Sequence, residues 1–292
     1  MDLEVAGSSP VDHPNLKGFQ MKTVSPDVYT ADYFLQRCGG VEFFDRYKAD
    51  ILKPMMQLAV KRAELEPGMK ILDVGCGRGE LVAHLSGRGF EVTGLDYSKD
   101  AIAVARGCFP KAQFICGDLF KCEFKEHSFD RIFFLGIIEH LYDEEIAKFF
   151  QEFRKLLKPG GLVIVTTCTN SLYFKSWTYK IRLIIARVLN SFGVKVKSPI
   201  PPRSDEDLVT HINEQNYFSL PKHFPGEFWT AHIEPRLNPK LCLAELYGKD
   251  LPPDFPLRSA SSFKKGFFKI LMAIPLLKLV FTRANIVLLR AR

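Results

Sequence analysis

Hydrophobic and polar residues follow two different periods along the middle of the chain. Short apolar runs recur between residues 70 and 167, and stretches with apolar side chains every three or four positions lie between them. The short runs are typical of buried strands, and the longer spacing is typical of amphipathic helices. We expect strands at 70–74, 91–95, 113–116, 131–135 and 162–167, and helices at about 79–87, 100–107 and 143–157.

This alternation predicts the fold class. Strands that alternate with helices form a parallel sheet, and right-handed crossovers place helices on both of its faces. We therefore expect an α/β protein with a doubly wound, mostly parallel, Rossmann-like sheet. Two further strands are expected at 228–235 and 284–292. Ligands of such sheets bind at the carboxyl ends of the strands.

The same pattern divides the chain into four parts. Residues 1–64 are expected to be an N-terminal helical cap, and residues 65–167 are the core just described. Residues 168–222 are interpreted as a lid insertion followed by a return helix. Residues 223–292 hold the last strands of the sheet, with a second, basic amphipathic insertion at 236–283.

Each insertion contains a helical stretch that is apolar on one side and basic on the other. The apolar stripes are Phe174, Trp177, Ile181, Ile184, Ile185 and Val188 in the first and Phe263, Phe267, Ile270, Leu271 and Ile274 in the second. The flanking basic residues are Lys175, Lys180, Arg182 and Arg187 in the first and Lys264, Lys265 and Lys269 in the second. Such stripes commonly pack on the domain, here as lids. Basic amphipathic helices also bind anionic lipid, so the second interpretation is a contact with an anionic membrane surface through 172–189 and 263–281.

Composition indicates the cellular compartment and excludes one class of partner. The chain has 292 residues, 47% of them hydrophobic, and a net charge of +7 without a run of like charges, so nucleic acid is not an expected partner. Seven cysteines without a CxxC pair indicate reduced thiols in a cytoplasm rather than a zinc site. The first residues lack the features of a signal peptide, and no charge-free apolar run approaches ~18 residues, so no spanning helix is expected.

One short stretch carries the main chemical signal. The sequence ILDVGCGRGE, from Ile71 to Glu80, has three glycines at alternate positions after a predicted strand, and an acid, Asp73, before them. Glycines allow a sharp turn and a close approach to a ligand. A dinucleotide fingerprint has its third glycine where Glu80 stands, and a carboxylate beside a pyrophosphate is repulsive. A nicotinamide dehydrogenase is therefore disfavoured, and Asp73 suits either a ligand with an ammonium group or a bracing role in the loop.

The stretch resembles motif I of the class I S-adenosylmethionine-dependent methyltransferases, and the chain looks like the bacterial small-molecule type. Later stretches resemble the other motifs in the family's order: VTGLDYS (92–98), FICGDLF (114–120), FDRIFFLGIIEHL (129–141) and LLKPGGLVIVTT (156–167). The resemblance covers about residues 65–170 well. It implies a seven-stranded sheet whose last strand is antiparallel, and ANIVLLRAR (284–292) fits that strand.

The resemblance also implies S-adenosyl-L-methionine as the cofactor and gives roles to single residues. Asp96 would hold both ribose hydroxyls, Asp118 would accept from the adenine amino group, and Leu119 would lie against the ring. The alternative for the acids is an ordinary strand-end cap. A helix at 29–36 is expected to fold over the cofactor. The expected cofactor-binding residues are Tyr33, Asp73, Gly75, Cys76, Gly77, Gly79, Asp96, Tyr97, Asp118, Leu119 and Leu135.

Two histidines are candidates for the general base that a hydroxyl acceptor needs. His140 follows the fourth predicted strand of the core and therefore lies at the ligand-binding edge, and His211 lies where the first insertion returns to the core. The alternatives are a backbone-bonded His140 and a His211 that merely belongs to a lid. Glu139 and His140 offer two metal ligands, but a third is not evident, so no metal site is expected.

Together these observations favour O-methylation of a small-molecule acceptor that is lipid-borne, quinone-like or a saccharide. The alternatives are N- or C-directed methyl transfer and a non-catalytic, regulatory module that binds the cofactor. A nucleic-acid methyltransferase would carry an N-P-P-Y-type motif where FFLGIIEHL (133–141) stands. We expect a cytoplasmic protein, peripheral on the inner face of the membrane if its basic helices bind lipid.

Overall fold

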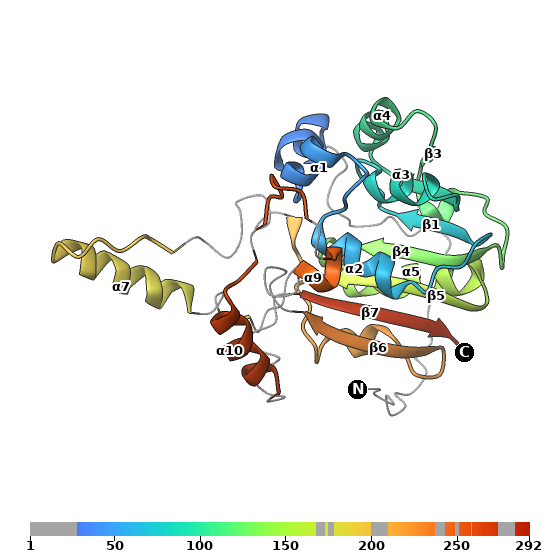
Figure 1. Cartoon of the computed structure of the whole chain (residues 1–292). Coiled ribbons are helices and arrows are strands. Elements are labelled where there is room, and N and C mark those ends of the chain that lie inside the picture. The colour runs from blue at the N-terminus through green and yellow to red at the C-terminus, as the bar shows by residue number, and fades with distance from the viewer. Residues whose placement is uncertain are drawn as a thin grey trace.

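The centre of the molecule is a seven-stranded sheet with the strand order β3-β2-β1-β4-β5-β7-β6 (Figure 1). A computed structural model describes residues 28–167, 173–174, 178–199, 210–236, 243–248, 251–257, 259–273 and 284–292. The strands are β1 (Lys70–Val74), β2 (Glu91–Asp96), β3 (Gln113–Cys116), β4 (Phe129–Leu135), β5 (Leu157–Thr167), β6 (Trp229–Arg236) and β7 (Ala284–Ala291).

The strand directions confirm the predicted fold class. β1 to β5 are parallel to one another, and β7 runs antiparallel to both β5 and β6. The carboxyl ends of the five parallel strands therefore meet at one edge of the sheet, where ligands of this class of fold bind. We call it the ligand edge, and it is formed by residues 75–79, 97–98, 117–118 and 136–140.

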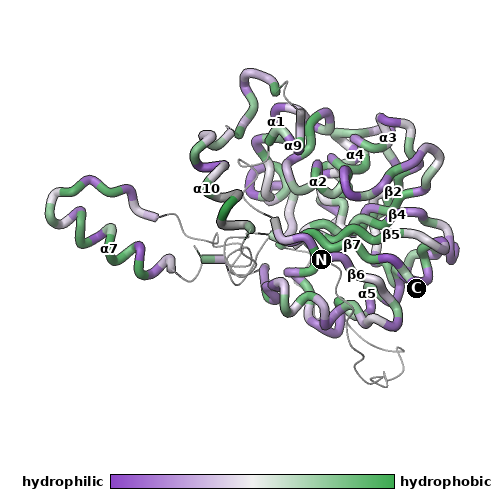
Figure 2. Tube along the Cα trace, turned by 60° about the horizontal axis from the view of Figure 1, so that its bottom comes forward, coloured by the Kyte–Doolittle hydropathy of each residue, from purple (hydrophilic) through white to green (hydrophobic). Residues whose placement is uncertain are grey.

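Two hydrophobic cores hold helices on opposite faces of the sheet. One face is covered by α5 (Asp143–Leu156) and the short helix η5 (Leu220–His223). The other is covered by α2 (Pro54–Arg62), α3 (Glu80–Ser86), α4 (Lys99–Cys108) and α9 (Leu243–Tyr247). In Figure 2 the central strands are the most hydrophobic segments, and the more polar segments lie around them, as expected for strands buried on both faces.

The sequence of α5 explains its position. Its apolar residues follow the three- and four-residue spacing of a single helical face, and Ile146, Phe150 and Phe153 are buried in the core. The Glu145 carboxylate accepts from the Tyr142 N–H at 2.9 Å at the start of the helix, and three acidic residues in the first turn favour the positive end of the helix dipole.

The predicted elements are present, with differences at their ends. β5 begins at Leu157 rather than at the expected residue 162, because residues 158–161 belong to the same strand. The pairing of β4 with β5 shifts its register between Phe129 and Arg131. The helix expected at 29–36 is instead a short π-helix, η2 (Tyr33–Arg37), which leads to α1 (Val41–Tyr47). Within the described residues 211–223, where the chain returns to the core, the helical element is the 3-10 turn η5, which has a proline in its first turn, and residues 200–209 lie outside the described residues.

The two insertions carry α7 (Tyr179–Ser191) and α10 (Ser262–Ala273), and α7 extends away from the sheet in Figure 1. Most of the described residues of their apolar stripes are exposed to solvent, with Ile184 60% and Phe263 83% accessible, whereas Phe174 is half-buried. Packing of these stripes on the domain as lids stays a prediction. Lys175, Trp177 and Ile274 lie outside the described residues, as do the side chains of Lys269 and Leu271. Among the described helices, none combines the length and the apolar character that crossing a bilayer requires.

Candidate active site

The loop after β1 is built on three glycines with left-handed backbone angles. The φ angles of Gly75, Gly77 and Gly79 are 74°, 52° and 82°. A Cβ atom on Gly75 would lie 2.4 Å from the Ile137 side chain, and one on Gly79 would lie 2.6 Å from the Phe114 ring. Both the backbone conformation and the packing therefore require glycine, and the loop lies tightly against the segment that follows β4.

Asp96, at the end of β2, braces this glycine loop. One carboxylate oxygen accepts from the Gly77 N–H at 2.9 Å, and the other accepts from the Ser98 N–H at 2.9 Å. Burial raises the pKa of Asp96, and these backbone hydrogen bonds act in the opposite direction. Each oxygen keeps a lone pair for a further donor, so the bracing contacts leave capacity for ribose hydroxyls.

Asp73 lies at the end of β1, beside β2, with its side chain almost fully buried. Burial, with the nearby charges of Asp96 and Glu80, raises the pKa of Asp73 to about 8. A carboxyl group in such surroundings favours a cationic partner, because a positive charge restores the ionised form.

The other expected cofactor-binding residues line the ligand edge at neighbouring positions. Asp118 caps the short helix η3 (Leu119–Lys121) by accepting from the Phe120 N–H at 3.1 Å, which is the role of an ordinary strand-end cap. Leu119 is buried and Leu135 is half-buried at the end of β4. Cys76 is also buried, and burial raises the pKa of its thiol, as for an inert cysteine.

Sequence reasoning missed the buried ion pair between Arg78 and Glu80. The Arg78 guanidinium donates to the Glu80 carboxylate at 2.7 Å and to the backbone carbonyls of Phe34 and Gly39 at 3.0 and 3.2 Å. It also lies over the Phe44 ring, 4.7 Å from the centroid. Arg78 therefore fastens the N-terminal cap to the glycine loop, and Glu80 has a structural partner at the position where a dinucleotide-binding loop has glycine.

Tyr29 connects the cap to the ligand edge. Its backbone carbonyl accepts from the Ser98 hydroxyl at 3.0 Å, its ring lies 6.1 Å from that of Tyr97, and its hydroxyl lies 3.2 Å from Nδ1 of His140. Burial and then the Asp96 charge raise the pKa of the Tyr29 hydroxyl. Tyr33, which the sequence singled out, packs on Tyr29 at 5.3 Å between ring centroids.

The fold brings together His140 and His211, the two catalytic candidates. Their ring centroids lie 4.8 Å apart at an edge-to-face angle. Nδ1 of His140 lies 3.0 Å from the Thr210 carbonyl oxygen. Since a carbonyl only accepts, this contact requires the proton on Nδ1, which leaves Nε2 of the neutral ring as a proton acceptor.

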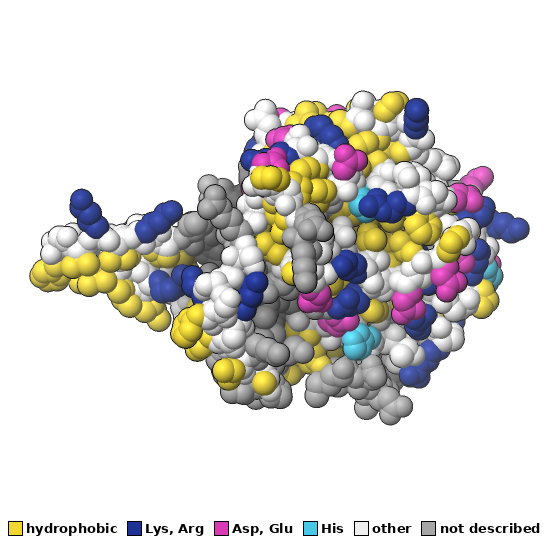
Figure 3. All heavy atoms as spheres, viewed as in Figure 1, with side chains coloured by type: hydrophobic (Ala, Val, Ile, Leu, Met, Phe, Trp, Pro, Cys, Tyr) yellow, Lys and Arg dark blue, Asp and Glu magenta, His cyan; other side chains and the backbone are white. Residues whose placement is uncertain are grey.

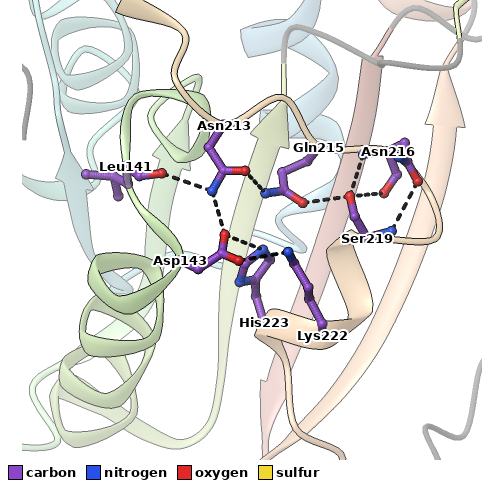
Figure 4. Close-up of polar contacts among 8 residues, drawn as sticks. All are labelled: Leu141, Asp143, Asn213, Gln215, Asn216, Ser219, Lys222 and His223. Atoms are coloured by element: carbon purple, nitrogen blue, oxygen red, sulfur yellow. Dashed lines mark hydrogen bonds and ion pairs between the residues drawn. The ribbon is translucent and has the colours of Figure 1, made fainter.

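A polar network holds the returning segment that carries His211 (Figure 4). Asn213 donates to the Leu141 carbonyl at 3.0 Å and to the Asp143 carboxylate at 2.7 Å, at the start of α5. Burial alone would raise the pKa of Asp143, but hydrogen bonds from Lys222 and Asn213 hold it below its ordinary value. The network therefore anchors residues 211–223 beside the segment that follows β4.

Glu139, His140 and His211 are also the group of metal-ligating side chains found among the described residues, so the fold brings a third ligand, His211, to the two that the sequence offered. Their ligand atoms lie within 4.8 Å of one another. Ligands of a tetrahedral zinc ion at ~2.0 Å would lie about 3.3 Å apart, so a site with this spread has to contract before it can hold such an ion.

Comparisons with known proteins agree with this geometry. The family described as "Methyltransferase domain" matches residues 71–161. The chain is 36% identical over 183 residues to a demethylmenaquinone methyltransferase of Chlorobaculum tepidum, a match that spans 59% of this chain and 75% of that one. It is 34% identical over 103 residues to a probable S-adenosylmethionine-dependent methyltransferase of Mycolicibacterium smegmatis, of which it spans only 38%.

Among solved structures, phosphoethanolamine N-methyltransferase 2 of Haemonchus contortus has a TM-score of 0.55 and 19% identity over 92% of this chain and 60% of that one, a likeness of fold. The match to the C. tepidum relative spans three quarters of that protein, and the antiparallel β7 of the seven-stranded sheet is the one that the motifs imply. The chain therefore belongs to the class I S-adenosylmethionine-dependent methyltransferases, whose methyl donor is S-adenosyl-L-methionine.

Proposed function

We propose that the chain transfers a methyl group from S-adenosyl-L-methionine to an oxygen atom of a small-molecule acceptor that is lipid-borne, quinone-like or a saccharide. The observation that carries the proposal is the edge-to-face pair of imidazoles of His140 and His211, since His140 belongs to the segment after β4 that packs on the glycine loop through Ile137. A hydroxyl acceptor must lose a proton during transfer, and a neutral histidine whose Nδ1–H is held by a carbonyl is suited to take it.

The donor seat in this proposal is formed by the expected cofactor-binding residues. Asp73 faces the ammonium group of the donor, Asp96 receives the ribose hydroxyls, and Asp118 with Leu119 receives the adenine. The burial of Asp73 and Asp96 supports these roles, because both carboxylates gain from positive or hydrogen-bonding partners in that environment. Tyr33, Tyr97 and Leu135 complete the walls.

The methyl group moves by in-line displacement from the sulfonium to the acceptor oxygen. The protein's contribution is to hold the two reacting atoms in line and to exclude water, since the sulfonium is already activated. His140 takes the hydroxyl proton on Nε2, and His211, 4.8 Å away between ring centroids, orients the acceptor. The cap residues Tyr29 and Tyr33 cover the site from the side of β2.

A lipid-borne acceptor is supported by the exposed apolar stripes of α7 and α10, both of which belong to insertions at the carboxyl ends of their preceding strands. In this proposal the protein works at the cytoplasmic face of a membrane, in contact with anionic lipid through 172–189 and 263–281. The free cysteines among the described residues are compatible with that compartment.

The test is incubation of the purified protein with membrane extract and a donor labelled in its methyl group, followed by mass spectrometry. The expected product is a lipid-soluble molecule with a labelled O-methyl group. His140→Ala should lower its rate of formation by about 10²–10⁴-fold and leave the affinity for S-adenosylhomocysteine unchanged. A labelled N- or C-methyl product would show that the methyl group goes to nitrogen or carbon instead of oxygen. Binding of the donor without any labelled product would favour the regulatory module.

A further inference from the structure

The exposed apolar faces of α7 and α10 are the strongest feature of the molecule that the methyl-transfer chemistry does not use. On α7, six large apolar residues occur at positions 0, 3, 4, 7, 8 and 11 of one helical face, and all are exposed: Ile181 57%, Ile184 60%, Ile185 51%, Val188 48%, Leu189 36% and Phe192 80%. On α10, Phe263, Phe267 and Ile270 repeat the pattern, with 83%, 52% and 69% exposed. We call these nine residues the apolar ridge.

The part of the ridge on α7 lies on a helix whose C-terminal turn is held by specific hydrogen bonds. The chain reverses at Gly193, with a φ of 80°, and residues 194–199 follow the helix back. The Asn190 side chain fixes this return by donating to the Val196 carbonyl and accepting from the Val196 N–H, both at 2.9 Å. Ala186 on α7 is buried, whereas the ridge residues are exposed.

Charge accompanies the ridge. Figure 3 shows hydrophobic side chains along one side of α7 and Lys or Arg side chains along the other, with more hydrophobic side chains at the surface of α10. The stretches 168–204 and 255–283, which lie within the insertions, contain no Asp or Glu and hold 13 of the 40 basic residues. The rest of the chain therefore has 27 basic residues against 33 acidic ones and is net negative. The positive charge is thus concentrated in the stretches that carry the ridge.

We propose that the apolar ridge docks the protein on the surface of an anionic lipid bilayer. A short amphipathic helix with large aliphatic residues on one face and lysine or arginine beside them lies in the interface, with its apolar face among the acyl chains and its basic groups at the head groups. Two separate helices carry this combination, and neither is long enough to span. An anionic surface attracts the basic stretches and repels the net-negative remainder, which orients the molecule.

The purpose of this docking rests on the proposed function. Both insertions follow the carboxyl ends of strands, so they belong to the edge where the proposed acceptor binds. A docked α7 and α10 would direct the ligand edge toward the membrane. An acceptor whose reactive oxygen is at the lipid head-group level then reaches His140 without leaving the bilayer. The docking itself needs neither donor nor acceptor.

The test is co-sedimentation of the full chain with vesicles of equal parts phosphatidylglycerol and phosphatidylcholine, compared with vesicles of phosphatidylcholine alone, at low salt. The wild type should sediment with the anionic vesicles and much less with the neutral ones. Ile184→Ser combined with Phe192→Ser should lower the partition coefficient by about tenfold or more. Because these side chains are exposed, the variant should fold normally. Phe218→Ser is the matched control, since Phe218 is 67% exposed but belongs to neither helix.

A second pair of variants tests the charge. Lys180→Glu combined with Arg187→Glu should weaken binding to anionic vesicles, whereas Lys111→Glu, in the loop before β3, should not. The proposal is overturned if the wild type stays in the supernatant with anionic vesicles, or if the Phe218 control loses as much binding as the ridge variant. It is also overturned if light scattering finds a dimer that the ridge substitutions dissociate, since a second copy would then cover the ridge.

Calorimetry with S-adenosylhomocysteine on the same variants separates this proposal from the proposed function. The ridge variants should bind it with unchanged affinity, because none of the substituted residues touches the glycine loop. A wild type that binds S-adenosylhomocysteine but not vesicles overturns the docking alone. A wild type that binds vesicles but not S-adenosylhomocysteine overturns the methyl transfer alone.

Discussion

The ionisation of Asp73 is coupled to the ligand that binds at the end of β1. Its pKa of about 8, raised by burial and then by Asp96 and Glu80, means that the carboxyl group is mostly protonated at pH 7 in the ligand-free protein. A cation favours the carboxylate, so donor binding lowers this pKa and releases a proton. The affinity for the donor should therefore increase as the pH rises from 6 toward 8 and level off above it.

This release is measurable by calorimetry with S-adenosylhomocysteine, which keeps the ammonium group, in two buffers of different ionisation enthalpy at pH 7. The wild type should give different heats in the two buffers, corresponding to a proton released. Asp73→Asn should give equal heats and an affinity that no longer depends on pH in this range. Equal heats for the wild type would mean that Asp73 does not meet the ammonium group.

The spread of Glu139, His140 and His211 leads to a second prediction. Because the group has to contract before it can hold a tetrahedral ion, methyl transfer should proceed without a divalent cation. Extensive dialysis against EDTA should leave the rate unchanged. A rate that falls on dialysis and returns on addition of Zn²⁺, Mn²⁺ or Mg²⁺ would instead make these three side chains ligands.

Between elements, the Arg78–Glu80 pair joins the glycine loop to the N-terminal cap. Both side chains are buried, and Arg78 makes its remaining hydrogen bonds to two cap carbonyls. Removing one member of a buried pair leaves the other charge unpaired, so Arg78→Met should lower the free energy of unfolding by about 3–5 kcal/mol.

Urea denaturation followed by circular dichroism measures this loss. Arg88→Met is a suitable control, because Arg88 is exposed and should change the stability by less than about 0.5 kcal/mol. Substituting Glu80 by Gln in the Arg78→Met background should restore part of the loss, since it removes the unpaired carboxylate. If Arg78→Met behaves like Arg88→Met, the cap is held by other contacts.

The sequence predicted the parts of the site that depend on local patterns. The parallel strands and the glycine loop follow from periodicity and glycine spacing, and the resemblance to the family's motifs pointed to the acids at the ends of β2 and β3. Arg78, Tyr29 and the pairing of His140 with His211 were not predicted, because each depends on contacts between segments far apart in the chain, such as the 111 positions that separate Tyr29 from His140. The hydrophobic pattern also could not predict that α7 is exposed, since a buried lid and an exposed amphipathic helix have the same periodicity.

At the scale of the whole protein, binding of the donor should stabilise the N-terminal cap and the core together. Tyr29 contacts Ser98 and His140, and the Ala31 N–H donates to Asp100 at 2.9 Å, so the cap touches both sides of the proposed donor seat. A ligand that fills the seat adds contacts to both, and at 100 times its Kd it stabilises the native state by ~2.7 kcal/mol.

Hydrogen exchange with and without S-adenosylhomocysteine checks this coupling. Amides of residues 29–47 and 75–79 should become more protected together, while those of α7 should not change, because α7 extends away from the sheet (Figure 1). Protection confined to the glycine loop would mean that the cap closes independently of the donor.

The antiparallel placement of β7 between β5 and β6 has an evolutionary consequence. Both long insertions begin at the carboxyl ends of their strands, so the chain can lengthen or replace them without disturbing the loops that hold the nucleoside. In the proposed function, acceptor choice and donor choice are thereby encoded in separate stretches of sequence. A relative that receives the two insertions of this chain should take over the acceptor preference of this chain. Its affinity for S-adenosyl-L-methionine should be unchanged.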